Sequence, residues 1–469
     1  MSNAFNIGFG QTEQEVSITD LPIKGSIPDW LEGDLIRNGP GTFTVGQERY
    51  RHWFDGLAML HRFSFRKGKV AYQNKYLECK AYHEALAKNR IAYSEFATDP
   101  CFSLFDRFKA IFHSPMTDSA KVSIAQIADK VLALSETPMQ IQFDPDTLKS
   151  LGVYNYDSKV NRHVTTVHPQ IDKKRGKNYN ITTRFSRISH YRILELKESQ
   201  NPGLIASLPT KEVSYMHSFG MSPNYFIITE FPFMVNPLNI LFSGKPFIEN
   251  YRWKPERGTV FYIIDRQTGA LVKQMTTEAF FAFHHVNAFE KDGSLFVDLV
   301  CYPDSGIIDS FYLERIQEGT QALPCGEFRR YAIDLSNHSI RYETIGDAGM
   351  ELPRYDEERY HMDGDYRYVY GVGVQPEKPE SFYNQLVKLD LQTGHSYTWY
   401  EAGSYPGEGV FIGKPDRSAE DDGVLLSVVL NEDKENSFLL ILNAADMQEI
   451  GRAEVPHPIL FGYHGAYLQ

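Results

Sequence analysis

The sequence lacks the features of a secreted or membrane-spanning protein. No run of about 18 apolar residues occurs in the 469-residue chain, so no membrane-spanning helix is expected. The first residues, Met-Ser-Asn-Ala-Phe-Asn-Ile-Gly, contain no basic segment followed by an apolar one, so no signal peptide is expected. The four cysteines form no CxxC pair, which indicates neither a zinc knuckle nor a disulfide framework. These absences favour a cytoplasmic protein.

The chain also lacks an excess of positive charge. It has 48 Lys and Arg against 60 Asp and Glu, a net charge of −12, and no basic stripe, so no nucleic-acid partner is expected. A hydrophobic fraction of 42% excludes a wholly disordered chain. Aromatic residues are abundant, with 28 Tyr and 31 Phe, which favours strands and a pocket for a flat apolar ligand.

Long helical periodicity is scarce, and a different repeat takes its place. Beyond residue 140, an alternating apolar strand, an acidic or polar turn and a second strand recur; the turns are marked by Asp144, Glu195, Asp265, Asp334, Asp390 and Asn443. The steps between these marks are 51, 70, 69, 56 and 53 residues, the size of a four-stranded β-propeller blade. Six marks and the unmarked N-terminal region predict an all-β, seven-bladed propeller that spans residues 1–469 as one domain.

Two apolar segments, residues 96–126 and 231–253, interrupt this pattern. In the first, Phe102, Phe105, Phe108 and Phe112 recur at helical spacing. Two interpretations are open, a helix that caps the propeller and an interfacial helix that enters a lipid surface. We expect the second segment to form the other side of the same surface.

Residues 280–293 and the alternating run of residues 294–300 that follows are predicted to form a β-hairpin, with His284 and His285 on its first strand and the turn at residues 290–293. Neighbouring residues of a strand point to opposite faces, so at most one of these imidazoles faces a given site. Two further histidines, His52 and His61, lie nine residues apart, but their sequence settings show no convergent geometry. We expect structural roles for both.

Four histidines share a setting, an apolar strand next to a turn or a glycine: His168, His217, His284 and His464. Their separations of 49, 67 and 180 residues place one on each of four blades. Because the inner strands of a propeller converge on its axis, the four imidazoles are candidates to bind one metal ion. Imidazole suits Fe, Cu, Ni and Zn, so the ligand type leaves the metal open.

Several motifs occur in one order along nearly the whole chain: Arg37-Asn38-Gly39-Pro40, the block from His52 to Gly56, Glu136, His168, His217, Phe283-His284-x-x-Asn287 and His464-Gly465. In these segments the chain resembles the carotenoid cleavage oxygenase family. The resemblance implies a seven-bladed propeller with a helical and loop cap over an axial site of ferrous iron, Fe(2+). It implies His168, His217, His284 and His464 as the metal ligands, with His284 rather than His285 because the ligand directly follows Phe283.

The resemblance also implies three glutamates behind the ligands, Glu136, Glu351 and Glu408. A carboxylate that accepts the distal N–H of a ligand imidazole fixes its tautomer and orientation and raises its basicity. The site is then expected to bind dioxygen and to cleave a conjugated C=C bond of a carotenoid or apocarotenoid into two carbonyl products. Cleavage at the central bond would release a retinal-type aldehyde.

The branch of the family is indicated by a few positions. Stilbene-cleaving members carry a Lys and a Tyr where this chain has Ser135 and Phe96, which argues against phenol-dependent cleavage. Residues 94–101 instead resemble the branch of the animal central-cleavage oxygenases and the retinoid isomerohydrolase, whose corresponding region docks on membranes. Peripheral membrane association and lipidation of Cys101 are therefore hypotheses. Two other functions stay open: retinoid isomerisation and hydrolysis at the same iron, and a non-catalytic propeller that binds carotenoid.

Overall fold

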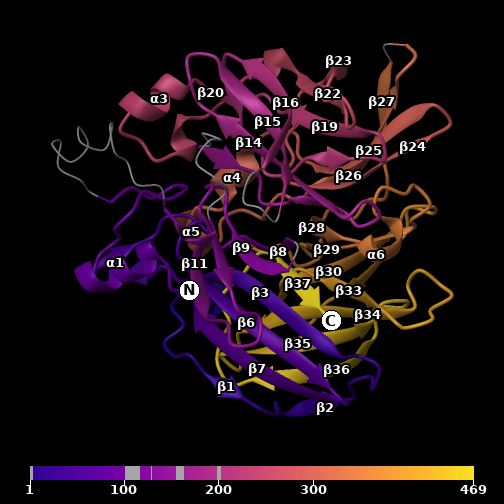
Figure 1. Ribbon diagram of the computed structural model, residues 1–469. Coiled ribbons are helices and arrows are strands. Elements are labelled where there is room, and N and C mark those ends of the chain that lie inside the picture. The colour runs from indigo at the N-terminus through magenta and orange to yellow at the C-terminus, as the bar shows by residue number, and fades with distance from the viewer. Residues whose placement is uncertain (1–3, 101–116, 128, 155–162, 198–201, 338) are drawn as a thin grey trace.

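The computed structural model describes residues 4–100, 117–127, 129–154, 163–197, 202–337 and 339–469. Within these residues the chain builds seven antiparallel sheets of four or more strands, which are the seven blades of a β-propeller (Figure 1). The predicted fold class is thus confirmed. We number the blades I to VII in the order of the chain.

Blades I to III contain the following strands. Blade I has the order β1 (Ser17–Ile18), β7 (Lys69–Tyr76), β6 (Leu57–Arg66), β3 (Gly33–Thr42) and β37 (Gly465–Leu468). Blade II has β11 (Ser150–Tyr154), β10 (Gln140–Phe143), β9 (Lys130–Leu134) and β8 (Ser123–Ile127). Blade III has β16 (Gly203–Thr210), β15 (Ser189–Leu196), β14 (Lys177–Arg184) and β12 (Val164–Thr165), and β13 (Gln170–Asp172) also pairs with β14.

Blades IV to VII follow the same plan. Blade IV has β23 (Leu271–Thr277), β22 (Thr259–Asp265), β19 (Tyr225–Glu230) and β18 (Gly220–Met221); blade V has β27 (Ile340–Thr344), β26 (Glu327–Asp334), β25 (Ser294–Cys301) and β24 (His285–Lys291). Blade VI has β31 (Ser396–Trp399), β30 (Gln385–Asp390), β29 (Tyr368–Gly373) and β28 (Glu351–Arg354). Blade VII has β2 (Ile23–Gly25), β36 (Glu449–Val455), β35 (Asn436–Asn443), β34 (Gly423–Asn431) and β32 (Ser404–Pro406), and β33 (Val410–Gly413) also pairs with β34.

The two ends of the chain close the ring. Strand β37 pairs with β3, which aligns Arg37 with Gly465, and β2 pairs with β36 of the last blade. Figure 1 shows β37 beside β3. Because blade I contains strands from both ends of the chain, the C-terminal segment with His464 is held by residues near the N-terminus.

The turns predicted from the repeat are observed in five of six cases. Five side chains at the end of the third strand of a blade each accept a backbone N–H two residues on: Asp144, which directly follows β10, and Asp265, Asp334, Asp390 and Asn443, which are the last residues of their strands. Such a bond forms an Asx turn, which reverses the chain into the outermost strand. Glu195 differs, because it lies inside β15 and pairs with Lys177.

Burial decreases from the middle of a blade to its outer edge. All six residues of β30 are buried, since blade VI is covered by a neighbour on each side, whereas the outermost strand β27 of blade V is exposed at four of its five positions. The hairpin predicted for residues 280–300 is confirmed as β24 and β25. Its first strand begins at His285, so His284 lies directly before the strand.

Helices gather at one end of the propeller. They include α1 (Lys80–Lys88), α3 (Pro237–Phe242), α4 (Gly306–Ser310) and α5 (Leu313–Glu318), which lie on the left-hand side of Figure 1; α6 (Glu357–Tyr360) lies elsewhere. Short 3-10 helices occur at Ala4–Phe9, Ile248–Asn250 and Pro255–Arg257. None of the helices in the described part of the chain is both long and apolar enough to cross a membrane.

The two predicted insertions are described unequally. The aromatic helix expected around Phe102 to Phe112 falls in residues 101–116, which lie outside the described residues. The last residues of the range 96–126 already belong to β8 of blade II. In the range 231–253, β20 (Phe233–Val235) and β21 (Arg252–Trp253) form a small sheet with β17 (Val213–Ser214), and α3 lies between them. A further two-stranded sheet joins β4 (Thr44–Val45) to β5 (Glu48–Arg49).

Candidate metal centre

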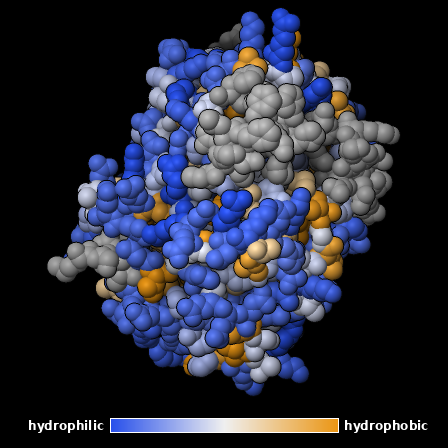
Figure 2. Space-filling view, turned by 90° about the vertical axis from the view of Figure 1, so that its left-hand side faces the viewer, coloured by the Kyte–Doolittle hydropathy of each residue, from blue (hydrophilic) through white to orange (hydrophobic). Residues whose placement is uncertain are grey.

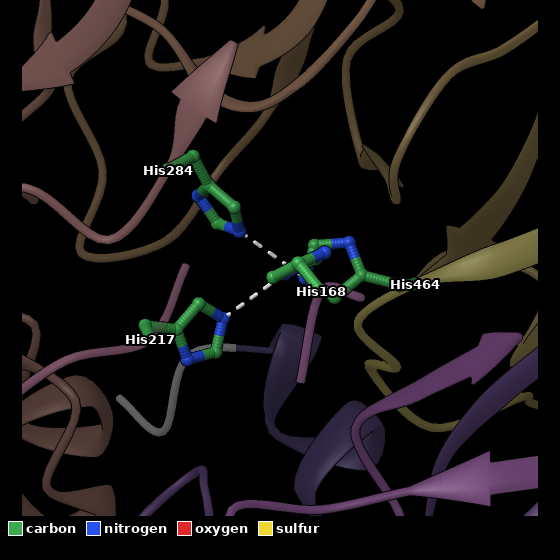
Figure 3. Close-up of side chains that lie close together, drawn as sticks. All are labelled: His168, His217, His284 and His464. Carbon is green, nitrogen blue, oxygen red and sulfur yellow. Dashed lines mark hydrogen bonds between the residues drawn. The ribbon is translucent and has the colours of Figure 1, made fainter. Parts of the chain in front are cut away.

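The four histidines named above come together from four blades. His168 lies between β12 and β13 of blade III, His217 precedes β18, His284 precedes β24, and His464 precedes β37. One ring nitrogen from each lies within 4.8 Å of those of the other three. Figure 3 shows the four rings pointing toward one another, and we call them the four-histidine cluster.

The spacing of the ring nitrogens fits one metal ion. The Nε2 atoms of His168 and His217 are 3.3 Å apart, and those of His284 and His464 are 3.2 Å apart. Nitrogen ligands about 2.1 Å from a common ion lie about 3 Å apart at right angles and about 4.2 Å apart when opposite. The observed distances are close to this pattern, so the cluster has room for one ion between the rings.

Three carboxylates hold the rings from behind. Glu136 accepts a hydrogen bond from Nδ1 of His217 at 2.9 Å, and Glu351 accepts one from Nδ1 of His284 at 2.6 Å. Glu408 accepts one from Nδ1 of His464 at 2.8 Å. These glutamates belong to blades II, VI and VII, so each of the seven blades contributes one histidine or one glutamate to the site.

The carboxylates decide which nitrogen of each ring is free. In a neutral imidazole one nitrogen carries the proton and the other a lone pair, and here the Nδ1 proton is donated to the glutamate. The Nε2 atoms of His284 and His464 therefore face each other as two acceptors across 3.2 Å. Two acceptors do not form a hydrogen bond, whereas a cation between them would bind both lone pairs. The donor set thus fits a metal.

Burial favours the neutral form that metal binding requires in three of these histidines, His168, His217 and His464. Desolvation lowers the pKa of His464 to about 4, although the carboxylate of Glu408 opposes that shift. Burial lowers the pKa of His217 in the same way and outweighs the effect of Glu136. The pKa of His168 lies well below its usual value because of burial and the three neighbouring rings.

Glu408 has a stronger support than the other two glutamates. Its carboxylate accepts from Arg37 at 2.5 Å, from Arg354 at 3.3 Å and from the backbone N–H of Gly465 at 2.9 Å. Burial alone would raise the pKa of Glu408, but Arg354, His464 and Arg37 hold it well below its usual range. The carboxylate therefore stays ionised although the side chain is fully buried.

Among the described residues, Glu351 has no such cation. Its Oε2 accepts from His284 and from the backbone N–H of Leu352 at 2.7 Å. Burial favours its neutral form, but the ring of His284 opposes this and the pKa of Glu351 is lowered. His168 has no carboxylate on its ring within the described residues. Its segment is held instead by the N–H of Val167, which donates to the carbonyl of His217 at 3.2 Å.

The remaining histidines of the sequence analysis have local partners. His285 points away from the cluster, as the strand geometry predicts, and its two nitrogens bond to Ser218 at 2.9 Å and Thr229 at 2.8 Å. His52 donates from Nε2 to the carbonyl of Ile308 at 2.8 Å, and His61 bonds to the hydroxyl of Tyr72 at 2.9 Å. Both are buried and away from the cluster.

A cavity of about 480 Å³ lies next to the cluster and is lined by His217, His284 and His464. Much of its wall is aromatic; the rings include Trp53, Phe54, Phe96, Phe283, Phe311 and Tyr463. Phe54 contacts Phe96 and Phe283 with ring centroids 5.2 and 5.6 Å apart, so these rings form a continuous surface. Such a wall suits a flat, conjugated, apolar ligand.

Comparison with known proteins agrees with this geometry. The family model described as retinal pigment epithelial membrane protein matches residues 9–469. The mitochondrial carotenoid-cleaving dioxygenase of Mustela putorius furo is 31% identical, over 97% of this chain and 95% of that protein. The human beta,beta-carotene 15,15'-dioxygenase is 32% identical, over 99% and 94%. The chain belongs to the carotenoid oxygenase family.

Solved structures of the family show the same fold. A cobalt-substituted apocarotenoid oxygenase from Synechocystis has a TM-score of 0.89 and 26% identity, and the match covers 99% of this chain and 98% of that one. A chimera of that oxygenase with the retinal pigment epithelial protein has a TM-score of 0.88 at 26% identity. The two relatives named above are carotenoid dioxygenases, and the chain is an oxidoreductase of this kind.

Sequence reasoning did not find all residues of this centre. Arg37 was part of a motif, but no local pattern pairs it with Glu408, 371 residues away. Arg354 and the buried pair of Lys121 and Glu95 in the cavity wall were also missed. No local pattern marks Lys121 either, because its partner Glu95 lies 26 residues earlier in the chain.

Proposed function

We propose that this carotenoid oxygenase uses ferrous iron, Fe(2+), held by His168, His217, His284 and His464, to cleave a conjugated C=C bond of a carotenoid or apocarotenoid. When bound, the iron supplies the activation of dioxygen. The overall reaction adds one oxygen atom to each carbon of the double bond and yields two aldehydes, so no external reductant is needed. The observation that supports this most directly is the four-histidine cluster at the wall of an aromatic cavity.

The chain contributes by holding its groups in place. Glu136, Glu351 and Glu408 fix the ring orientations and keep the Nε2 lone pairs directed at the ion. The aromatic wall binds the polyene and excludes water, so that one double bond lies next to the metal. No side chain has to donate or remove a proton, since both products are formed from the double bond and dioxygen alone.

The substrate assignment draws on the relatives. One named relative is a beta,beta-carotene 15,15'-dioxygenase and another a carotenoid-cleaving dioxygenase, which makes cleavage at or near the centre of a carotenoid the leading expectation. Phe96 lines the cavity and contacts Phe54, and Ser135 lies beside Glu136. Neither side chain can activate a phenol, so a stilbene is not the expected substrate.

The test is product analysis under labelled dioxygen. The iron-loaded protein would be incubated with β-carotene, an apocarotenal, a retinyl ester and a hydroxylated stilbene under 18O2, and the products separated by mass. The proposal predicts aldehydes that carry the label from one or both polyenes. Isomerised retinol without label would indicate the isomerohydrolase function instead. Polyene binding without turnover by the iron-loaded protein would indicate a non-catalytic propeller.

We also propose that the end of the propeller where α1, α3, α4 and α5 gather binds to a membrane surface, and that the polyene enters the cavity from this membrane. Leu86 on α1 and Leu238 on α3 are each 57% exposed, and Ile240 of α3 lines the cavity. Figure 2 shows this side, with separate apolar patches on a mostly hydrophilic surface. Apolar side chains of this kind insert into the interface of a bilayer.

The cytoplasmic location expected from the sequence stays a prediction, since some relatives are named mitochondrial.

Sedimentation with phospholipid vesicles tests the membrane proposal. Leu86→Glu combined with Leu238→Glu is expected to release the protein from the vesicles. Leu204→Glu is a matched control, because Leu204 is 56% exposed but lies on β16 of blade III. Equal loss of binding in the control, or none in the double variant, would contradict the proposal.

A further inference from the structure

The cavity has a polar side in addition to its aromatic wall. Lys121 and Glu95 both line it and form an ion pair, with Nζ 2.6 Å from Oε2. The two residues are only 3% and 5% exposed. Thr117, Ser135 and Thr137 line the cavity as well, and we call these five residues the polar wall. A buried ion pair in a cavity for an apolar ligand is costly, since both charges lose hydration.

The polar wall is attached directly to the metal centre. Lys121 comes two residues before β8, and β8 pairs with β9, which leads into Ser135 and Glu136. Val122, the residue after Lys121, accepts a hydrogen bond at its carbonyl from the N–H of His464 at 3.2 Å. A group that contacts Lys121 is therefore held in the same cavity as the double bond that lies at the cluster.

Hydrogen-bond donors on the polar wall are nearly all in use. The Thr117 hydroxyl donates to Oε1 of Glu95 at 2.7 Å, and the Thr137 hydroxyl donates to the carbonyl of Thr117 at 2.9 Å. A hydroxyl has one proton, so in the 3.0 Å bond between Ser135 and Thr137 it is Ser135 that donates. None of these three hydroxyls has a proton left for a substrate.

Lys121 is the exception. An ammonium group has three N–H donors, and within the described residues Glu95 is the one side chain that accepts from it. The unused donors belong to a charged group inside a cavity of low polarity, where a hydrogen bond is strong. They suit an oxygen atom that accepts, such as that of a carbonyl or hydroxyl group.

We propose that Lys121 binds an acceptor oxygen on the substrate and that the enzyme therefore prefers an oxygenated polyene, such as an apocarotenal or a hydroxylated carotenoid, over a hydrocarbon carotene. The inference rests on the proposed cleavage activity and adds the substrate class. Lys121 acts as a specificity-determining residue, and Glu95 positions its ammonium group. The aromatic wall accepts the apolar part of either kind of substrate, so the oxygen contact decides between them.

The experiment compares kcat/KM for an apocarotenal, a hydroxylated carotenoid and β-carotene in the iron-loaded protein. Two variants are used, Lys121→Met, and Lys121→Met with Glu95→Gln, which removes both charges and leaves an acceptor for Thr117. Loss of one hydrogen bond to a charged group predicts a fall of about ten- to a hundredfold for the oxygenated substrates. The ratio of oxygenated to hydrocarbon turnover is expected to fall by the same factor, with β-carotene as the reference because it has no oxygen for Lys121 to contact, and the Tm of each variant verifies that it folds.

The outcomes separate this inference from the proposed function. If the unaltered enzyme cleaves no polyene, the proposed function is wrong. If it cleaves polyenes but the variants keep its ratio of oxygenated to hydrocarbon turnover, Lys121 does not select the substrate. An equal loss for all substrates, including complete loss, assigns the ion pair a structural role and also overturns the inference.

Discussion

Because Glu408 is paired with arginines, and Glu351 with none among the described residues, replacing each glutamate by glutamine should lower protein stability by different amounts. Glu351→Gln and Glu408→Gln each replace a carboxylate behind a histidine of the cluster by a neutral amide. In Glu351→Gln the amide oxygen still accepts from His284 and Leu352, as the carboxylate of Glu351 does. At position 408 the same change leaves the buried guanidinium of Arg37 without its anion.

The structure gives the size of each effect. Loss of the charge behind a ligand ring weakens metal binding by about 10- to 100-fold, which is about 1.4 to 2.8 kcal/mol, in both variants. Removing one partner of a buried ion pair is a separate effect, which lowers the free energy of unfolding by about 3 to 5 kcal/mol. Arg354 keeps a second carboxylate, Glu357 at 2.8 Å, whereas Arg37 is left without a carboxylate and its other partner within the described residues is the carbonyl of Tyr463. We therefore expect Glu408→Gln to lose about 3 kcal/mol of unfolding free energy and Glu351→Gln about 1 kcal/mol.

Urea unfolding of the metal-free proteins measures the stability term without any contribution from bound metal. Competition with a chelator of known affinity measures iron binding. Glu327→Gln on β26 is a control, because Glu327 is exposed and, among the described residues, forms an ion pair with Arg329 alone. Equal unfolding free energies for Glu351→Gln and Glu408→Gln, or unchanged iron affinity in either, would refute the reasoning.

Three further predictions concern pH, packing and metal removal. Burial lowers the pKa of His52 to about 3, so between about pH 6.5 and pH 3 the unfolded chain binds this proton and the folded protein does not. This group should therefore lower the free energy of unfolding by about 1.4 kcal/mol for each unit by which the pH decreases. In His52→Gln, urea unfolding curves should show a smaller loss of stability over the same pH range. A Cβ at Gly39 would lie 2.5 Å from Cα of Gly462. Gly39→Ala should therefore displace the segment before His464 and lower both the Tm and the iron content. Gly176→Ala is the control, because no atom lies within 4 Å of a Cβ at that position, and it should cost only about 1 kcal/mol of backbone strain in its turn. With free iron at about a thousand times its Kd, bound iron should stabilise the folded protein by about 4 kcal/mol, so the chelated protein should unfold at a correspondingly lower Tm than the iron-loaded protein. A Tm unchanged by chelation would argue against a bound metal.

The blades could be predicted from the sequence because their turns are local. An Asx turn needs one side chain and the backbone two residues on, so Asp265 and Asp390 identify the outer hairpins without any distant contact. Glu195 also follows an apolar run in the sequence, but it lies inside β15. The sequence around a glutamate does not distinguish a position at the end of a strand from one within it. The number of blades was still correct, because Glu195 belongs to blade III.

The centre itself depended on contacts between distant residues. The spacing of the histidines indicated four blades, but four metals stayed open until the family motifs were considered. The bond between Arg37 and Glu408 joins residues 371 positions apart through the closure of the ring, and no local pattern predicts it. The pairing of Lys121 with Glu95 depends in the same way on how the segment before β8 packs against residues 94–96.

The central claim is that four imidazoles from four blades bind one iron ion. X-ray absorption at the iron edge of the anaerobically purified protein, together with elemental analysis, tests it most directly. We predict one ferrous ion per chain with four nitrogen neighbours at about 2.1 Å, and loss of iron in His284→Ala but not in His285→Ala. Iron absent from the purified chain and not bound on addition, or iron retained in His284→Ala with unchanged neighbours, would contradict the account.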